Sequence, residues 1–211
     1  MMYMITSDRF GEFVDEIAEM HRLRYRVFKE RLAWDVTVSG DMEIDEYDAL
    51  APVYLLQRNH AGRIEGCVRL LPSMGPTMLR NSFPALLEGE PAPSRATVWE
   101  SSRFCLDVDP TAQKAELGLS HATFELFAGM CEFGLARQLT DIVTVTDVLV
   151  ERIVRRIGIP WRRLGRPRRI GNSLAVAGLA EVSWATLSRI RKAGALPGPV
   201  LWEPVPLKAI A

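Results

Sequence analysis

The sequence is poor in the residues that build metal sites and disulfide frameworks. Its 211 residues include three cysteines and three histidines. An odd, widely spaced set of cysteines argues against a disulfide scaffold. Cys67, Cys105 and Cys131 are therefore expected to be small buried residues in a reducing compartment, which we predict to be the cytoplasm. The histidines show no metal-ligand spacing, so no metal site is predicted.

Long apolar runs and linkers are also absent. No stretch approaches the roughly 20 residues that span a bilayer, so no membrane span is expected. The start "MMYMITSDRF" has neither the basic end nor the apolar segment of a secretory signal. The best candidate linker, "GEPAPSR" at 89–95, is short. With 48% hydrophobic and 25% charged residues, 1–211 is predicted to form a single globular domain.

The two signs of charge are separated along the chain, although the formal net charge is zero. Residues 1–50 hold 12 acids and 6 bases, whereas 111–211 holds 14 bases and 8 acids. Two differently charged surfaces are therefore expected. The most basic segment, 152–169, contains no acid and eight arginines, which are Arg152, Arg155, Arg156, Arg162, Arg163, Arg166, Arg168 and Arg169.

Apolar periodicity and turn residues predict alternating helices and strands. A helix is predicted over 12–31, and a strand hairpin over 53–72 around a turn at Gly62. The other predicted strands are 2–6, 96–107, 141–146 and 173–182, and the other predicted helices are 111–138, 147–157 and 183–194. A short helix or an ordered loop is predicted over 78–87. This order predicts an α/β (α+β) fold, a three-layer α/β/α sandwich on a mixed, mostly antiparallel sheet.

Charged and aromatic residues stand out in four blocks. They are "RYRVF" with a following tryptophan, "EIDEYDAL", "GCVRLLP" and "WESSRF". Taken singly, each block has an ordinary explanation, such as an amphipathic helix, solvated loop acids or a surface ion pair. The residues concerned are Arg24, Phe28, Trp34, Asp45, Asp48, Arg69, Glu100 and Arg103.

Together the blocks resemble those of the N-acyl-homoserine lactone synthases of the LuxI type. The resemblance covers about 20–106, includes "FP" at 83–84, and continues more loosely through "VTVTDVLVERIVRRIG". It implies a GNAT-like acyltransferase fold. It also implies an enzyme that joins an acyl group from acyl-carrier protein, or from acyl-CoA, to the amine of S-adenosylmethionine. The methionine carboxylate then closes the lactone and expels methylthioadenosine. S-adenosylmethionine is a substrate, so no cofactor is expected.

The resemblance also assigns chemical roles to the charged residues. Glu100 is the candidate to take the proton of the acceptor amine, directly or through a water that it orients. Asp45 and Asp48 would be its electrostatic partners. The three arginines of the motif blocks would hold these acids in place or bind the substrate carboxylate by charge-assisted hydrogen bonds.

Two substrate pockets and a docking surface follow in the same way. Aromatic faces attract cations such as a sulfonium, so the S-adenosylmethionine pocket is predicted to include Arg24, Phe28, Trp34, Phe83 and Arg103. The acyl pocket is predicted to include Ser102, Thr144 and Thr146, and which threonine touches the chain near C3 is left open. The arginines of 152–169 could form only a solvated face, but acyl carrier proteins are acidic, so these arginines are predicted to dock the carrier.

A geometric consequence concerns the strand that carries Glu100 and Arg103. In a regular strand these two residues point to opposite faces, because they are three positions apart. A β-bulge around Ser101–Ser102 is therefore expected if both reach one pocket. Such a bulge would also free a backbone N–H to stabilise a tetrahedral oxyanion.

Two alternative functions have weaker support in the sequence. A general N-acetyltransferase would carry a Gly-rich turn after its central strand, and "VDPTAQKAELGLS" lacks one. A non-catalytic nucleic-acid binder would use the arginines, but Trp161 is the only aromatic residue among them. The acyl chain length, its oxidation at C3, the choice between carrier and CoA, and the oligomeric state are left open.

Overall fold

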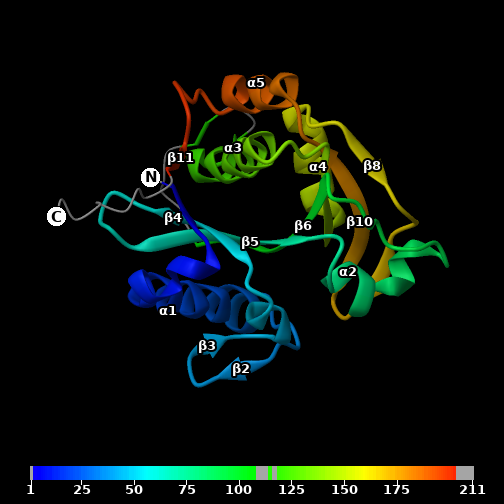
Figure 1. Cartoon of the computed structure of the whole chain (residues 1–211), viewed down its shortest axis with the longest axis horizontal. Coiled ribbons are helices and arrows are strands. Elements are labelled where there is room, and N and C mark those ends of the chain that lie inside the picture. Colours follow the sequence, from blue (N-terminus) through cyan, green and yellow to red (C-terminus); the bar gives the residue numbers. More distant parts are fainter. Residues whose placement is uncertain (1, 108–113, 116–117, 203–211) are drawn as a thin grey trace.

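The computed structural model describes residues 2–107, 114–115 and 118–202. A nine-stranded sheet runs through it in the order β11-β1-β4-β5-β6-β7-β10-β8, with β9 paired to β10. One face carries the helices α1 (Val14–Arg24) and α2 (Met78–Asn81) (Figure 1). The opposite face carries α3 (His121–Ala136), α4 (Val148–Ile157) and α5 (Trp184–Ala193). The predicted three-layer α/β/α sandwich is confirmed.

The sheet is mixed and mostly antiparallel, also as predicted. Only the pairs β1–β11 and β6–β7 are parallel among the strands that the structure describes. The strands of the sheet are β1 (Met2–Ile5), β4 (Val53–Arg58), β5 (Ile64–Pro72), β6 (Val98–Leu106), β7 (Asp141–Asp147), β8 (Trp161–Arg163), β9 (Arg168–Ile170), β10 (Ser173–Glu181) and β11 (Leu201–Trp202). A separate small hairpin consists of β2 (Val38–Ser39) and β3 (Met42–Glu43).

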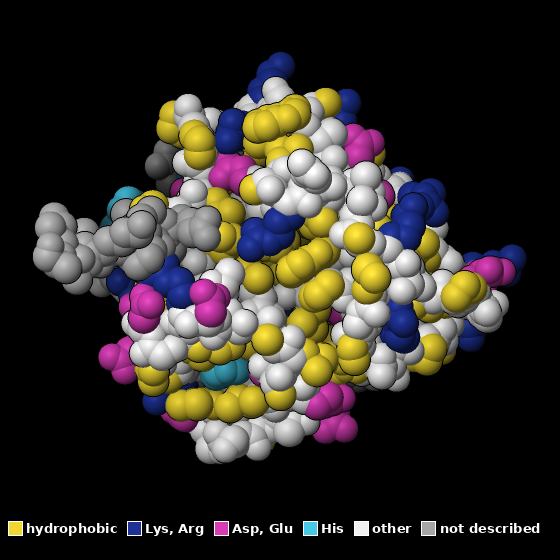
Figure 2. Space-filling view, in the orientation of Figure 1, with side chains coloured by type: hydrophobic (Ala, Val, Ile, Leu, Met, Phe, Trp, Pro, Cys, Tyr) yellow, Lys and Arg dark blue, Asp and Glu magenta, His cyan; other side chains and the backbone are white. Residues whose placement is uncertain are grey.

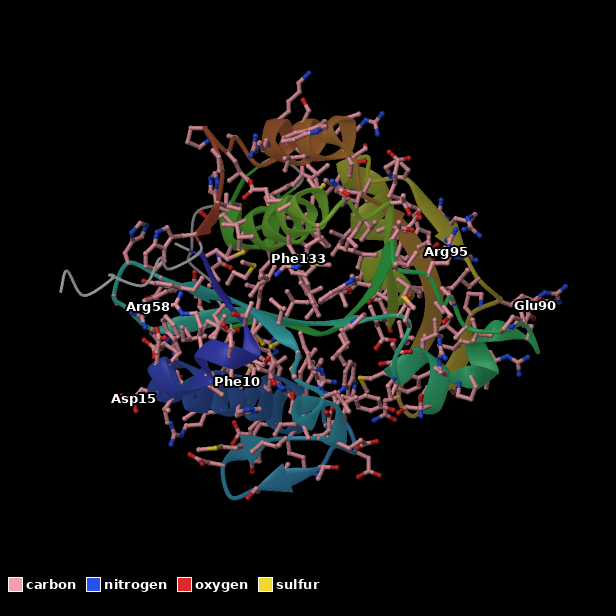
Figure 3. All side chains as sticks on the ribbon, in the orientation of Figure 1. Phe10, Asp15, Arg58, Glu90, Arg95 and Phe133 are labelled. Atoms are coloured by element: carbon pink, nitrogen blue, oxygen red, sulfur yellow. The ribbon has the colours of Figure 1, made fainter. Side chains whose placement is uncertain are left out.

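The main core lies between α3 and the sheet. Phe133 of α3 points towards the sheet (Figure 3), and its ring meets Trp99 of β6 edge to face at 5.1 Å. A side chain at Gly129 would place its Cβ 2.2 Å from the sulfur of Met2, so glycine is what allows α3 to approach β1. Burying a ring such as that of Phe133 contributes about 1.5–3 kcal/mol.

The predicted helix over 12–31 is present but changes its winding. A 3₁₀ helix, η1 (Ser7–Glu12), precedes α1, and a π-helix, η2 (Tyr25–Arg31), follows it. At the end of η2 the wider turn gives a hydrogen bond from the N–H of Leu32 to the carbonyl of Val27 at 3.0 Å, and the N–H of Trp34 then bonds to the carbonyl of Phe28 at 2.9 Å. As a result, the chain brings Trp34 back over Phe28 instead of continuing away from it.

The predicted helix over 111–138 starts too early. Helix α3 begins at His121, where the hydroxyl of Ser120 accepts a hydrogen bond from the N–H of Thr123 at 3.2 Å. Gly118 has a positive φ of 71°, which no α-helix accommodates. Residues 108–113 and 116–117 lie outside the described part of the chain. No helix among the described residues is long and apolar enough to cross a bilayer.

Strands β6 and β7 stay together over only part of their length. Their parallel pairing runs from Val98 opposite Asp141 to Ser101 opposite Thr144. Beyond that point β6 continues beside β5, and β7 continues beside β10. The sheet therefore opens between the second half of β6 and the end of β7.

Candidate active site

Arg24, the last residue of α1, is fully buried and bound by carboxylates from two following segments. Its Nε donates to Glu43 at 2.5 Å, and its two amino groups bind the two oxygens of Asp48 at 2.8 and 2.9 Å. Tyr54 on β4 donates its hydroxyl to Asp48 at 2.7 Å. Burial lowers the pKa of Arg24, but its hydrogen bonds and charge interactions with both acids outweigh burial and raise the pKa. Because none of its side chain is exposed, Arg24 anchors the acids and presents no surface to a substrate.

Arg69 on β5 extends the same ion network. It binds Asp45 at 2.5 and 3.0 Å and Asp48 at 2.7 Å. The two acids also form a capping box at the start of η3 (Glu46–Ala49). Asp45 accepts a hydrogen bond from the N–H of Tyr47, and Asp48 accepts one from the N–H of Asp45, each at 2.9 Å. Burial raises the pKa of Asp48, but hydrogen bonding and charge from Arg24, with the charge of Arg69, hold it well below its usual range. Asp48 is therefore ionised at neutral pH.

Arg103 reaches this network through a β-bulge in β6. The register of β5 with β6 shifts so that Arg103 and Phe104 face the single residue Val68. Arg103 has a φ of 54°, a conformation that is uncommon outside glycine and typical of functional sites. The bulge predicted around Ser101–Ser102 is thus present slightly later in the strand. It turns Arg103 to the face of the sheet that also carries Glu100.

Arg103 is the most exposed member of the ion network. It binds Glu43 at 2.9 Å and Asp45 at 2.7 Å, and its guanidinium lies over the ring of Phe28 at 5.6 Å. Its Nη1 also contacts the sulfur of Met78 at 3.3 Å. Its side chain is 11% exposed, while Glu43 is fully buried. A substrate that approaches the network therefore meets Arg103 before the other arginines.

Two aromatic residues stack beside Arg103. The rings of Phe28 and Trp34 lie 5.2 Å apart with an interplanar angle of 11°. Phe28 is buried and Trp34 is half-buried, so the indole is the outer layer. Phe83 lies apart from this stack and packs with Tyr47 and Met78. Of the predicted aromatic set, Phe28 and Trp34 are thus together, and Phe83 lies in a separate cluster whose Met78 contacts Arg103.

Glu100 on β6 faces the first turn of α2. It is 1% exposed, and its two carboxylate oxygens accept the N–H groups of Met78 and Leu79, each at 2.8 Å. Burial raises the pKa of Glu100, and these amide hydrogen bonds oppose the rise without cancelling it. Glu100 therefore positions α2, and through it Met78, while keeping a carboxylate that is easier to protonate than usual.

The three residues of the predicted acyl pocket lie on both faces of the sheet. Ser102 is on the α1 face, where its hydroxyl accepts from Arg69 Nε at 3.1 Å. Thr144 and Thr146 are on the α3 face, and the hydroxyl of Thr144 donates to the carbonyl of Ser101 at 2.9 Å. All three border the opening between β6 and β7. The structure brings the two threonines together and separates them from Ser102.

The arginines of 152–169 are all exposed, and Lys and Arg side chains gather over the β8 edge of the sheet (Figure 2). Two of them are held by Glu151, a buried acid just before the segment, at 3.0 Å from Arg155 and 2.7 Å from Arg163. Hydrogen bonds from Arg163 and Arg155 lower the pKa of Glu151. Within the described part of the chain, five others have no ion-pair partner within 4 Å, namely Arg152, Arg156, Arg162, Arg168 and Arg169.

Sequence reasoning missed Glu43 and Glu151, although a signal existed for each. Buried charges persist when they are paired. Three arginines with only Asp45 and Asp48 leave one positive charge uncompensated, and Glu43 lies in the same acidic stretch. Glu151 is the only acid on α4, four residues before Arg155. In both cases a count of charges over the motif would have pointed to the missing partner.

The fold is that of the GNAT-like acyltransferases. A mixed sheet opens between two parallel strands, and a buried acid–arginine network lies at the opening. A putative N-acetyltransferase from Lactobacillus plantarum shares this fold at a TM-score of 0.56 and 14% identity, covering 86% of this chain and 99% of that chain. A likeness at that identity shows the fold alone.

Comparison with known proteins gives the family. The Autoinducer synthase family model matches residues 12–190, and the chain belongs to this family. An acyl-homoserine-lactone synthase of Agrobacterium fabrum is 42% identical over 88% of this chain and 88% of its own. The crystal structure of the AHL synthase LasI, 38% identical, covers 92% of this chain and 95% of that chain with a TM-score of 0.80. The CoA-dependent synthase BjaI, solved with SAM and isopentyl-CoA, has a TM-score of 0.87 at 24% identity, covering 98% and 94%.

The function predicted from the motif blocks is therefore confirmed. The chain is an acyltransferase that joins an acyl group to the amine of S-adenosylmethionine and forms an N-acyl-homoserine lactone, a quorum-sensing signal. The two alternatives, a general N-acetyltransferase and a non-catalytic nucleic-acid binder, do not apply.

Proposed function

We propose that S-adenosylmethionine binds beside Phe28, Trp34 and Arg103, and that the acyl thioester enters where β6 and β7 part. The observation that carries this proposal is the position of Arg103. It is the most exposed member of a buried ion network, it lies over the Phe28 ring, and it stands on the bulge beside the opening. The cationic face of the acceptor would stack on Trp34. Its carboxylate would take the exposed edge of Arg103.

The reaction then proceeds in two balanced steps. The amine of S-adenosylmethionine loses a proton to a basic group and attacks the thioester carbonyl. The tetrahedral oxyanion collapses, forms the amide, and expels the donor as a thiol. The methionine carboxylate then attacks its own γ-carbon. That carbon–sulfur bond breaks, its electron pair goes to sulfur, and methylthioadenosine leaves with the neutral lactone.

Glu100 is the proposed base or the group that orients a water acting as base. Its raised pKa moves it towards the pH at which a base works best. The three arginines and three carboxylates of the ion network are already paired, so they form a fixed field that need not reorganise during the reaction. The bulge at Arg103 interrupts the regular backbone hydrogen bonds between β5 and β6. A backbone N–H at this point would stabilise the oxyanion.

Neither a cofactor nor a metal has a step in this mechanism. The thioester and the sulfonium each carry a leaving group, so both substrates are activated before they bind. We also propose that the enzyme works in the cytoplasm. In support, the three cysteines are free thiols, although the sulfur atoms of Cys67 and Cys105 lie 3.4 Å apart.

The test of the proposal is product formation by the purified chain. S-adenosylmethionine is supplied with acyl-carrier protein and acyl-CoA donors of several lengths, and mass spectrometry follows acyl-homoserine lactone and methylthioadenosine. Equal amounts of both products are expected with at least one donor. Methylthioadenosine without acylated lactone, or neither product with any donor, contradicts the proposal.

Trp34→Ala is expected to weaken the binding of S-adenosylmethionine. Losing the outer ring of the Phe28–Trp34 stack removes a cation–π contact, so the KM for S-adenosylmethionine should rise about 2- to 30-fold. The KM for the acyl donor should not change. Separate titrations of the two substrates measure this, with Trp184→Ala on exposed α5 as the control. An effect confined to the donor would place Trp34 outside the acceptor pocket.

Arg152→Glu with Arg156→Glu is expected to impair acyl-carrier docking. These exposed residues share a face of α4 and have no ion-pair partner among the described residues. Reversing them should raise the KM for an acyl-carrier donor about tenfold at low salt, and the difference should fade towards 1 M salt. Turnover at saturation and the KM for S-adenosylmethionine should hold.

Two comparisons make the docking test specific. Arg63→Glu with Lys192→Glu changes the net charge equally at exposed sites outside the arginine segment, and should leave the carrier KM unchanged. Arg155 and Arg163 are avoided because replacing them leaves the buried Glu151 without its partners. A reversal at Arg152 and Arg156 that affects small CoA donors as strongly as carrier donors would refute the docking assignment.

A further inference from the structure

Trp161, on the edge strand β8, packs its indole against Gly178 of β10. Its backbone pairs with Ala180, and its ring covers the neighbouring glycine, Gly178. A Cβ built on Gly178 would stand only 2.2 Å from Cζ2 of the indole and 2.4 Å from Cε2. Glycine at this position is therefore what lets the indole reach inward over the sheet.

This contact brings Trp161 next to the opening between β6 and β7. On its other side Gly178 pairs with Thr144 of β7, and directly opposed residues share a face with Cβ atoms about 4.5–5.5 Å apart. Thr144 is the last residue of β7 that pairs with β6. The ring of Trp161 thus lies one strand away from the place where the sheet opens, on the α3 face.

The indole N–H of Trp161 is a buried donor without an acceptor. Within the part of the chain that the structure describes, Nε1 is buried and makes no hydrogen bond. It is bonded to Cε2, one of the two ring atoms nearest to Gly178, so the N–H lies close to the contact with β10. Nearly all buried polar groups in proteins find a partner, so this unpaired N–H is available to an acceptor on a bound ligand.

The hydroxyl of Thr144 cannot donate a hydrogen bond to a bound acyl chain. It donates its proton to the carbonyl of Ser101 at 2.9 Å, which leaves it able to accept but not to donate elsewhere. A carbonyl oxygen on a bound acyl chain needs a donor. The N–H of Trp161 is a donor near Thr144 and Gly178 that is unused within the described part of the chain.

We propose that Trp161 is a specificity-determining residue of the acyl site. Its indole closes the site beyond Thr144, and its N–H donates to an oxygen substituent near the thioester end of the acyl chain. The enzyme therefore prefers 3-oxoacyl donors to unsubstituted ones of equal length. This inference rests on the proposed entry of the acyl chain between β6 and β7.

Trp161→Phe tests the donor role while keeping most of the ring. The kcat/KM values are measured with 3-oxooctanoyl and octanoyl carrier donors. The wild-type preference for the 3-oxo donor should fall about tenfold, because a paired N–H is lost on one substrate only. The octanoyl rate should hold or rise. Trp184→Phe, at a ring that is 73% exposed on α5, should leave both rates unchanged.

A second measurement uses the wild-type chain and does not depend on how the variant folds. The ¹⁵N–¹H signal of the Trp161 indole is followed by NMR, assigned by its absence from Trp161→Phe or from a conservative Trp161→Tyr variant. It should move downfield with a non-reactive 3-oxoacyl thioether and stay in place with the unsubstituted one. The inference is overturned if an active Trp161→Phe enzyme keeps the wild-type ratio of kcat/KM values for the two donors. It is also overturned if the indole signal shifts equally, or not at all, with the two thioethers. Failure of the wild type to make lactone from any donor overturns the proposed function instead.

Discussion

Replacing Arg24 with methionine is expected to lower the free energy of unfolding by about 3–5 kcal/mol. The guanidinium is fully buried and satisfies Glu43 and both oxygens of Asp48. Methionine fills much of the space but leaves two buried carboxylates short of positive charge. The loss of one partner from a buried ion pair is strongly destabilising because the remaining charge stays away from water. Urea denaturation of both proteins measures the difference.

The matched control for Arg24→Met lies on the same helix. Arg22 pairs with Asp41 at 3.1 Å, but these side chains are 40% and 69% exposed, so Arg22→Met should change stability by no more than about 1 kcal/mol. Similar losses for the two variants would mean that the buried network contributes nothing special to the fold.

The same network predicts how stability depends on pH. The folded pKa of Asp48 is held well below the value of about 3.9 that an unfolded aspartate shows. The stabilisation is therefore fully present above about pH 4 and is lost as the pH falls through the folded pKa. In Arg24→Met this acid-dependent part should shrink, so the difference in stability between the variant and wild type should narrow steadily as the pH falls below about 4.

Most of the layout was predictable because it follows from local patterns. The hairpin around Gly62, the buried strand 141–146 and the helix that ends at Gly158 depend on apolar spacing and on glycines with φ of 84° and 87°. The short strands β8, β9 and β11 were not predicted. They contain two or three residues each and form only because β10 or β1 offers an edge, which is tertiary information.

The site was predictable in its membership and less so in its arrangement. The motif blocks named Asp45, Asp48, Arg69 and Arg103, and these do form one ion network. The spacing of apolar residues did not reveal the π-helix that stacks Trp34 on Phe28, because α-helices and π-helices favour the same residues. The hydrogen bonds from Glu100 to α2 could not be predicted either, because nearly every residue has a backbone N–H and the sequence does not show which of them a carboxylate binds.

Glu100→Gln is expected to lower kcat by about 10²- to 10⁴-fold. The substitution keeps the shape of the side chain and removes its ability to take a proton. Glutamine offers one acceptor oxygen where Glu100 binds the N–H groups of both Met78 and Leu79. One of these amides must then face the side-chain NH₂, so part of the loss would come from a displaced α2. Rate alone therefore does not separate a base from a residue that only positions α2.

The pH profile of kcat separates the two roles. Burial raises the pKa of Glu100, so the wild-type rate should fall as the pH drops through a value above the usual 4.3 of a glutamate, when the carboxylate becomes protonated. The residual activity of Glu100→Gln should lack this acidic limb and stay flat over the same range. The variant should still fold, because burial disfavours the ionised carboxylate that it removes. A folded Glu100→Gln enzyme that keeps the acidic limb would show that another group takes the proton and that Glu100 only holds α2 in place.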